Sequence, residues 1–188
     1  MVVRSVVLFA HIVGMLVLFV GLALEWLSLE SLQRSTAPGQ GSPWVSVLGA
    51  LPRYMAMAVG LILVSGIYLA ARVGVLDNGW VRVSFGAMFL MGILGGPVIR
   101  SQMRAIRDAG SGDRDGTPAT LRRHASHPLV RASLRARTAV GLAIVFLMIG
   151  KPELGESLLV IGAALVVGAL MSVPQQTRFG MPLYRSQK

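Results

Sequence analysis

Two ionisable side chains lie within an otherwise apolar stretch near the start of the chain. The stretch "HIVGMLVLFVGLALEW" runs from His11 to Trp26 and carries the imidazole of His11 and the carboxylate of Glu25. An imidazole can ligate haem iron or copper, whereas a carboxylate inside a membrane exchanges a proton or forms an ion pair. Either group is costly to expose to hydrocarbon. We therefore expect both side chains to face other helices rather than lipid.

The spacing of the residues in this stretch predicts one polar helical face. At about 100° per residue, the residues that fall on that face are His11, Gly14, Leu18, Gly21, Glu25 and Ser28. The remaining positions are apolar and suit contact with lipid. We predict that Gly14 and Gly21 let a neighbouring helix approach closely, as small residues do in membrane bundles.

A basic residue is well placed to neutralise Glu25. Arg53 lies at the start of the second apolar segment, on the side of the membrane where the first segment ends. We therefore predict an ion pair between Glu25 and Arg53. The favoured role of this pair is a structural clamp, and the alternative is a gate or proton-relay carboxylate.

His11 is the candidate cofactor ligand. The favoured interpretation is a hydrogen bond to a neighbouring helix, and the alternative is that His11 binds haem b as an axial ligand or binds copper. The other two histidines fall in a basic loop, so a methionine or a second copy of the chain would supply the second ligand. Met88 and Met91 share a helical face and carry thioethers that suit Cu(I), although methionine is also an ordinary core residue.

The composition indicates a membrane protein. The chain has 188 residues, of which 54% are hydrophobic and 14% are charged, and its mean hydropathy is +0.66. Soluble domains carry about 25% charged residues. The net charge of +10 comes mainly from arginines that separate apolar blocks, which favours contact with anionic lipids over nucleic acid. The absence of cysteine excludes disulfides and thiolate metal sites.

The apolar segments predict an all-α, polytopic bundle of five transmembrane helices that forms a single domain over residues 1–188. The spans are expected at 5–29, 52–73, 80–99, 130–150 and 155–173, with a basic loop at 100–130. Pro52 is expected as the first residue of the second span. The positive-inside rule places the basic loop in the cytoplasm of a bacterium, with the N-terminus outside the cell and the C-terminus inside.

Two features flank the end of the third span. Gly92 and Gly96 are spaced for close helix packing. Beyond them, Arg100, Arg104 and Arg107 share one face of an amphipathic segment and are predicted to contact lipid headgroups.

Three apolar motifs of this chain resemble those of small bacterial membrane proteins related to the copper-resistance D family. They are "AHIVGMLVLFVGLAL", "AVGLILVSGIYLA" and "SLRARTAVGLAIVFLMIGKPELGESLLV". The resemblance implies a small multi-spanning protein in which the early histidine, His11 here, contacts a metal or haem.

No catalytic constellation of residues stands out in the sequence, which favours a non-enzymatic role. The favoured function is an accessory or assembly subunit of a larger membrane complex. The expected partners are other membrane protein subunits or further copies of the chain. The alternatives are a haem- or copper-binding redox protein that uses His11 and, after that, a small transporter.

Overall fold

The computed structural model describes residues 2–34, 42–95, 104 and 125–171. Within these ranges the fold is all-helical, as the sequence predicts. The helices are α1 (Val2–Arg34), α2 (Ser42–Val73), α3 (Gly79–Gly95), α6 (Pro128–Gly150) and α7 (Leu154–Leu170).

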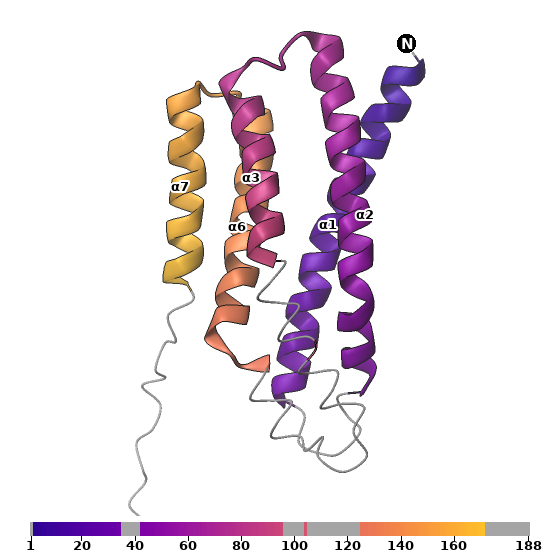
Figure 1. The fold of residues 1–188 in the computed structure, drawn as a ribbon, viewed down its shortest axis with the longest axis vertical. Helices are drawn as coiled ribbons and strands as arrows, with labels where there is room; N and C mark the ends of the chain where they lie inside the picture. Colours follow the sequence, from indigo (N-terminus) through magenta and orange to yellow (C-terminus); the bar gives the residue numbers. More distant parts are fainter. Residues whose placement is uncertain (1, 35–41, 96–103, 105–124, 172–188) are drawn as a thin grey trace, which may run out of the picture.

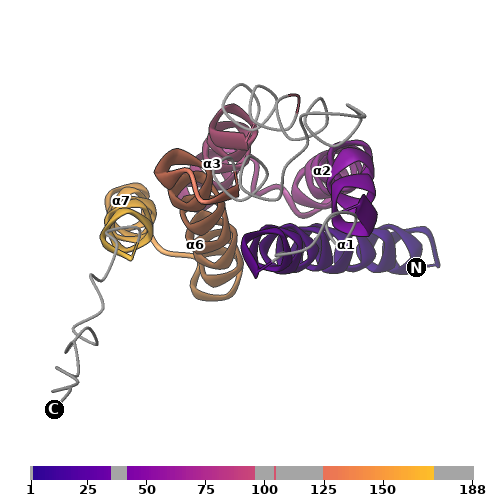
Figure 2. The same cartoon turned by 90° about the horizontal axis from the view of Figure 1, so that it is seen from below.

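The helices form two groups that lie side by side (Figures 1 and 2). Helices α1 and α2 pack against each other along most of their length as an antiparallel hairpin. In the second group, α6 packs against both α3 and α7, and it also contacts α1. Helix α6 is therefore the main connection between the hairpin and the other group.

Two glycines allow the close approach of α1 and α2. A Cβ atom added to Gly14 would lie 2.9 Å from Cγ1 of Ile62, and one added to Gly21 would lie 3.0 Å from Cγ of Met55. Distances this short leave no room for a larger side chain without movement of the neighbour. Gly14 and Gly21 therefore lie at the contact between the two helices.

Helix α2 begins ten residues before the predicted span. Pro52 lies inside the helix rather than at its start, so the prediction that Pro52 is the first residue of this helix is wrong. The helix starts at Ser42 and has Pro43 in its first turn, where a missing N–H leaves no hydrogen bond unmade. The turns before Pro52 bury Leu48 and Leu51, and this packing outweighs the unfavourable effect of an internal proline.

Two short connections lie at the end of the bundle that also holds the N-terminus (Figure 1), here called the turn end. The first, residues 74–78, begins at Gly74, whose φ of +75° suits a residue without a Cβ. The second, residues 151–153, begins at Lys151, which caps α6 in the left-handed conformation with φ 47°. At the opposite end, His127 and Pro128 start α6, and the ring of His127 accepts a hydrogen bond from the backbone N–H of Leu129.

Within the described residues, three helices are long and apolar enough to cross a membrane, namely α1, α2 over Pro43–Val73, and α6. Helices α3 and α7 are also apolar but have 17 described residues each. At 1.5 Å per residue, 17 residues extend about 26 Å, slightly less than the roughly 30 Å of bilayer hydrocarbon.

Candidate functional site

The polar face predicted for the first helix is buried. All six of its residues are buried in the bundle: His11, Gly14, Leu18, Gly21, Glu25 and Ser28. The neighbouring positions Phe9, Leu16 and Val20 are 56–68% exposed, as expected for side chains that face lipid. The prediction that this stripe faces other helices is therefore confirmed.

His11 is anchored to α2 through one ring nitrogen. Its Nδ1 lies 3.1 Å from the carbonyl oxygen of Ile62 and 3.0 Å from Oγ of Ser65. A carbonyl oxygen only accepts hydrogen bonds, so Nδ1 must carry the proton. The hydroxyl of Ser65 donates to the carbonyl of Leu61, and its oxygen is therefore free to accept from His11 as well. This arrangement fixes the neutral tautomer whose lone pair is on Nε2.

His11 lines a cavity of about 370 Å³ between the two helix groups. Its wall comes from α1, α2, α3, α6 and both connections at the turn end, and it is mainly apolar. The polar side chains in the lining are those of His11, Asn78, Ser84 and Lys151. A cavity of this size and character suits a small apolar or amphipathic molecule.

Two methionines share the cavity with His11. Met88 of α3 and Met148 of α6 both line it, whereas the predicted ligand Met91 does not. Met91 is buried one turn further along α3, with its sulfur near Gly141 of α6. The structure therefore places His11 and Met88 around one space and leaves Met91 outside it. Among the described residues, no group of three or more His, Cys, Asp or Glu side chains is close enough to hold a metal ion.

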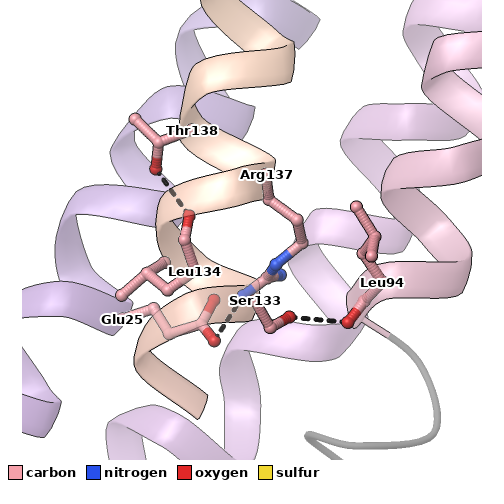
Figure 3. Close-up of polar contacts among 6 residues, drawn as sticks. All are labelled: Glu25, Leu94, Ser133, Leu134, Arg137 and Thr138. Carbon is pink, nitrogen blue, oxygen red and sulfur yellow. Dashed lines mark hydrogen bonds and ion pairs between the residues drawn. The ribbon is translucent and has the colours of Figure 1, made fainter. Parts of the chain in front are cut away.

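Glu25 forms an ion pair with Arg137 rather than with the predicted partner. Nη2 of Arg137, on α6, donates to Oε1 of Glu25 at 2.6 Å, and both side chains are at least nine-tenths buried (Figure 3). The predicted partner, Arg53, is exposed on α2. The prediction of an ion pair between Glu25 and Arg53 is therefore corrected to a pair between Glu25 and Arg137.

The geometry of α2 explains the change of partner. Met55 packs against Gly21 of α1, so position 55 faces the hairpin interior. Arg53 is two residues earlier, which corresponds to about 200° around the helix. Its side chain therefore points away from α1, although it lies at the expected depth.

The surroundings of Arg137 are shaped to hold its guanidinium. A Cβ atom added to Gly95 of α3 would lie 3.0 Å from Nη1 and 3.1 Å from Cδ of Arg137, so glycine makes room for the side chain. One turn earlier on α6, Ser133 donates from Oγ to the carbonyl oxygen of Leu94 at 2.6 Å (Figure 3). Helix α6 is therefore joined to α1 through the ion pair and to α3 through Ser133.

Two buried polar atoms beside the pair have no hydrogen-bond partner among the described residues. They are Nε of Arg137 and Oγ of Ser28. The ion pair therefore satisfies the carboxylate of Glu25 through a single guanidinium nitrogen, and part of the hydrogen-bonding capacity of Arg137 is unused.

The remaining predicted site residues are two glycines near the end of the third span and three arginines that follow it. Gly92 is exposed on α3, and a Cβ atom added there would meet nothing within 4 Å. Arg104 is exposed. Gly96, Arg100 and Arg107 lie outside the described residues.

Two residues of these sites, Ser65 and Arg137, are not among those predicted from the sequence. Ser65 lies on a helical face of α2 with Ala58 and Ile62, all of them buried, and this spacing is visible in the sequence. Arg137 is one of several arginines in "RASLRAR", and no local pattern distinguishes the buried one from its neighbours.

The fold and the two buried polar sites define the class of protein. Long apolar helices with lipid-compatible outer faces and polar groups turned inward are the construction of an integral membrane protein. Residues 5–152 match the family described as "Predicted integral membrane protein (DUF2269)", and the chain belongs to this family. Comparisons with curated proteins and with solved structures found no match.

Proposed function

We propose that the protein crosses a bacterial cytoplasmic membrane five times, with the N-terminus outside the cell and the C-terminus inside. The apolar character of α3 and α7, and their packing beside the longer α6, supports their inclusion as spans. The excess of arginine between and beyond the apolar segments supports the orientation.

The lack of cysteine in the chain allows a direct test of this topology. Asp77 at the turn end and Arg34 at the opposite end have side chains that are 93% and 78% exposed. In intact spheroplasts, a membrane-impermeant maleimide should label Asp77→Cys and should label Arg34→Cys only after permeabilisation. The reverse labelling pattern would refute the orientation. Labelling of both variants from outside would mean that α2, the helix between the two positions, does not cross the membrane.

The function that the geometry supports best is cofactor binding in the cavity around His11. We propose a membrane redox protein that holds haem b there or, as the alternative, copper. The observation that carries this proposal is the hydrogen bond from Nδ1 of His11 to the carbonyl of Ile62. Ligand histidines commonly donate one ring N–H to a backbone carbonyl, which orients the ring and makes the other nitrogen the ligand.

The donors around the cavity fit both candidate groups. His11 and Met88 would hold the group, because an imidazole nitrogen and a thioether are both ligands of haem iron and of Cu(I) in proteins. The resemblance to the copper-resistance D group is a further reason to test copper. A bound haem or copper ion would supply one-electron transfer, and the chain would orient the ligands and exclude water through the apolar wall.

The proposal is tested by measuring the haem and copper content of the full chain after purification from native-like membranes. We expect a Soret band or stoichiometric copper in the wild type, and loss of either in His11→Ala. His127→Asn is the matched control, because it removes a histidine outside the cavity and keeps a side chain able to cap α6. Wild-type protein that has neither a Soret band nor copper, even after incubation with haemin or Cu(I), would contradict the proposal.

A second candidate is the accessory or assembly subunit favoured by the sequence. Its specific support is on α3, where Gly86 and Gly92 lie about 120° apart around the helix and both meet no neighbour within 4 Å. Another helix could approach α3 at either position. Stable co-purification with other subunits, weakened by Gly86→Leu, is the expected result. A small transporter, the remaining alternative, requires ion or proton flux in liposomes that contain the purified chain.

A further inference from the structure

A second hollow lies at the opposite end of the bundle from the His11 cavity. It has a volume of about 100 Å³ and lies between the end of α1 and the beginning of α6. Its lining consists of Trp26, Leu29, Glu30, Gln33, Arg131, Leu134 and Arg135. This hollow, here called the α1–α6 groove, is separate from the cofactor cavity and plays no part in the proposed redox function.

The groove has an apolar floor and a cationic rim. Leu29 and Leu134 are 3% and 4% exposed and form the floor, whereas Arg131 is exposed and Arg135 is partly exposed. Positions 131 and 135 are one helical turn apart, so their side chains leave α6 on the same face. Among the described residues neither arginine has a carboxylate within salt-bridge distance.

The side chain of Arg135 is held in place by an aromatic ring and not by an ion pair with a described carboxylate. Its guanidinium carbon lies 5.6 Å from the centre of the Trp26 ring, in a cation–π contact. A cation–π contact of this kind does not use the N–H donors of the guanidinium on an acceptor oxygen, so these donors are available to a ligand. Planar N–H donors of this kind bind the oxygens of phosphate groups.

The acidic residue of the groove is already neutralised. Glu30 accepts a hydrogen bond from Nη2 of Arg34, one turn along α1, at 2.6 Å. The amide of Gln33 donates to the carbonyl oxygen of Ala125 at 2.9 Å and so ties the residues before α6 to α1. The rim therefore keeps a net positive charge and is held by contacts between both helices.

The residues of the groove are of the types found at the level of the lipid headgroups. Trp26 is 43% exposed and follows the apolar run of α1, a position typical of the aromatic residues found at membrane interfaces. Arginines at this level attract anionic headgroups. We propose that the α1–α6 groove binds a phosphate group, carried by an anionic lipid or by a soluble phosphate, through Arg131 and Arg135.

Binding is measured on the full chain by native mass spectrometry from mixed micelles. The probes are phosphatidylglycerol, phosphatidylcholine at the same concentration, and inorganic phosphate. We expect phosphatidylglycerol to bind in preference to phosphatidylcholine, and Arg131→Gln combined with Arg135→Gln to weaken binding about 25-fold, because each arginine near an anionic surface contributes a factor of about five. Inorganic phosphate that displaces phosphatidylglycerol at equal concentration would identify a soluble phosphate as the ligand, and failure to displace it would identify the lipid.

Two further variants make the result decisive. Arg72 lies on Tyr68 at 6.0 Å, at the turn end and outside this groove, so Arg72→Gln removes a stacked arginine and should leave the affinity unchanged. Glu30→Gln removes the acidic group of the rim and should tighten binding several-fold, a gain that general destabilisation would not produce. Equal binding of the two lipids, or equal weakening by Arg72→Gln and by the double variant, would overturn the proposal.

Discussion

The buried stripe of α1 carries two polar sites that differ in how they are completed. His11 and Glu25 are 14 positions apart, about 21 Å along the helix axis, and they are 7% and 3% exposed. The partners of His11 belong to α2, within the same hairpin. The partner of Glu25 belongs to α6, in the other helix group.

This difference separates an anchored side chain from a connecting one. The hydrogen bonds of His11 use only Nδ1 and leave the ring beside a cavity of about 370 Å³. The carboxylate of Glu25 faces a guanidinium that fills the available space between α1, α3 and α6. The first arrangement suits a site that receives a ligand, whereas the second suits a structural link between helices.

The largest expected effect is the loss of that link. Glu25→Leu and Arg137→Met should each lower the free energy of unfolding by about 3–5 kcal/mol, because each removes one partner of a buried pair and leaves the charge of the other uncompensated. The double variant Glu25→Leu with Arg137→Met should recover most of the loss, since neither charge is then buried alone. Unfolding by a denaturing detergent in mixed micelles measures all three values.

Arg53→Gln is the matched control for this prediction. Arg53 is exposed, and its replacement should change the free energy of unfolding by less than about 0.5 kcal/mol. Losses that simply add in the double variant would show that Glu25 and Arg137 are not coupled.

The second-largest effect is expected from the contact between Gly14 of α1 and Ile62 of α2. Gly14→Ala should destabilise the protein by about 1–3 kcal/mol, because the new methyl group would meet Ile62 at 2.9 Å. It should also weaken ligand binding, since the carbonyl of Ile62 accepts the hydrogen bond from His11. Gly92→Ala places the same methyl group in open space and should be neutral or stabilising by up to about 1 kcal/mol. Equal losses for the two variants would disprove the packing argument.

The sequence predicts the inward face of α1 well because that face depends on one helix only. A period of 3.6 residues determines which side chains share a face, and the cost of polar groups in lipid determines which face turns inward. The same local rules predict the all-helical fold and the approximate extent of the apolar helices. They are insufficient at Pro52, where packing of Leu48 and Leu51 extends α2 past a proline.

The partners of the polar residues depend on how the helices are arranged, which local rules do not give. Arg53 was selected for its depth in the membrane, and depth alone does not say which way a side chain points. Arg137 is 112 positions from Glu25, and only the packing of α6 against α1 brings them together. For the same reason the sequence predicts the shared face of Met88 and Met91, but it does not predict the cavity that Met88 lines and Met91 does not.

A smaller effect is expected from loosening the anchor of His11. Ser65→Ala removes the hydroxyl oxygen that lies 3.0 Å from Nδ1 and should weaken the binding of haem or Cu(I) by about 10-fold, as is usual for residues that orient a ligand histidine. Ser84→Ala is the control, because Ser84 lines the same cavity but donates to the carbonyl of Trp80 on its own helix. Titration of the purified apoprotein with haemin or Cu(I) measures both affinities. A loss of the same size in Ser84→Ala would mean that the cavity lining, and not the orientation of His11, controls affinity.

The smallest effect is also the most selective, because it compares two methionines one turn apart on α3. Met88→Leu and Met91→Leu should each change the free energy of unfolding by less than about 1.5 kcal/mol, since leucine and methionine have similar volumes. Of these two methionines, Met88 lines the cavity with His11 and Met91 does not. Replacement of Met88 should therefore shift the absorbance spectrum or lower the ligand affinity by several-fold, and replacement of Met91 should do neither. Spectra and titrations of the two variants, compared with those of the wild type, show which methionine affects the bound ligand. If Met91→Leu alters the spectrum as much as Met88→Leu does, the ligand does not occupy the cavity beside His11, and the contrast between the two ends of the α1 stripe loses its functional meaning.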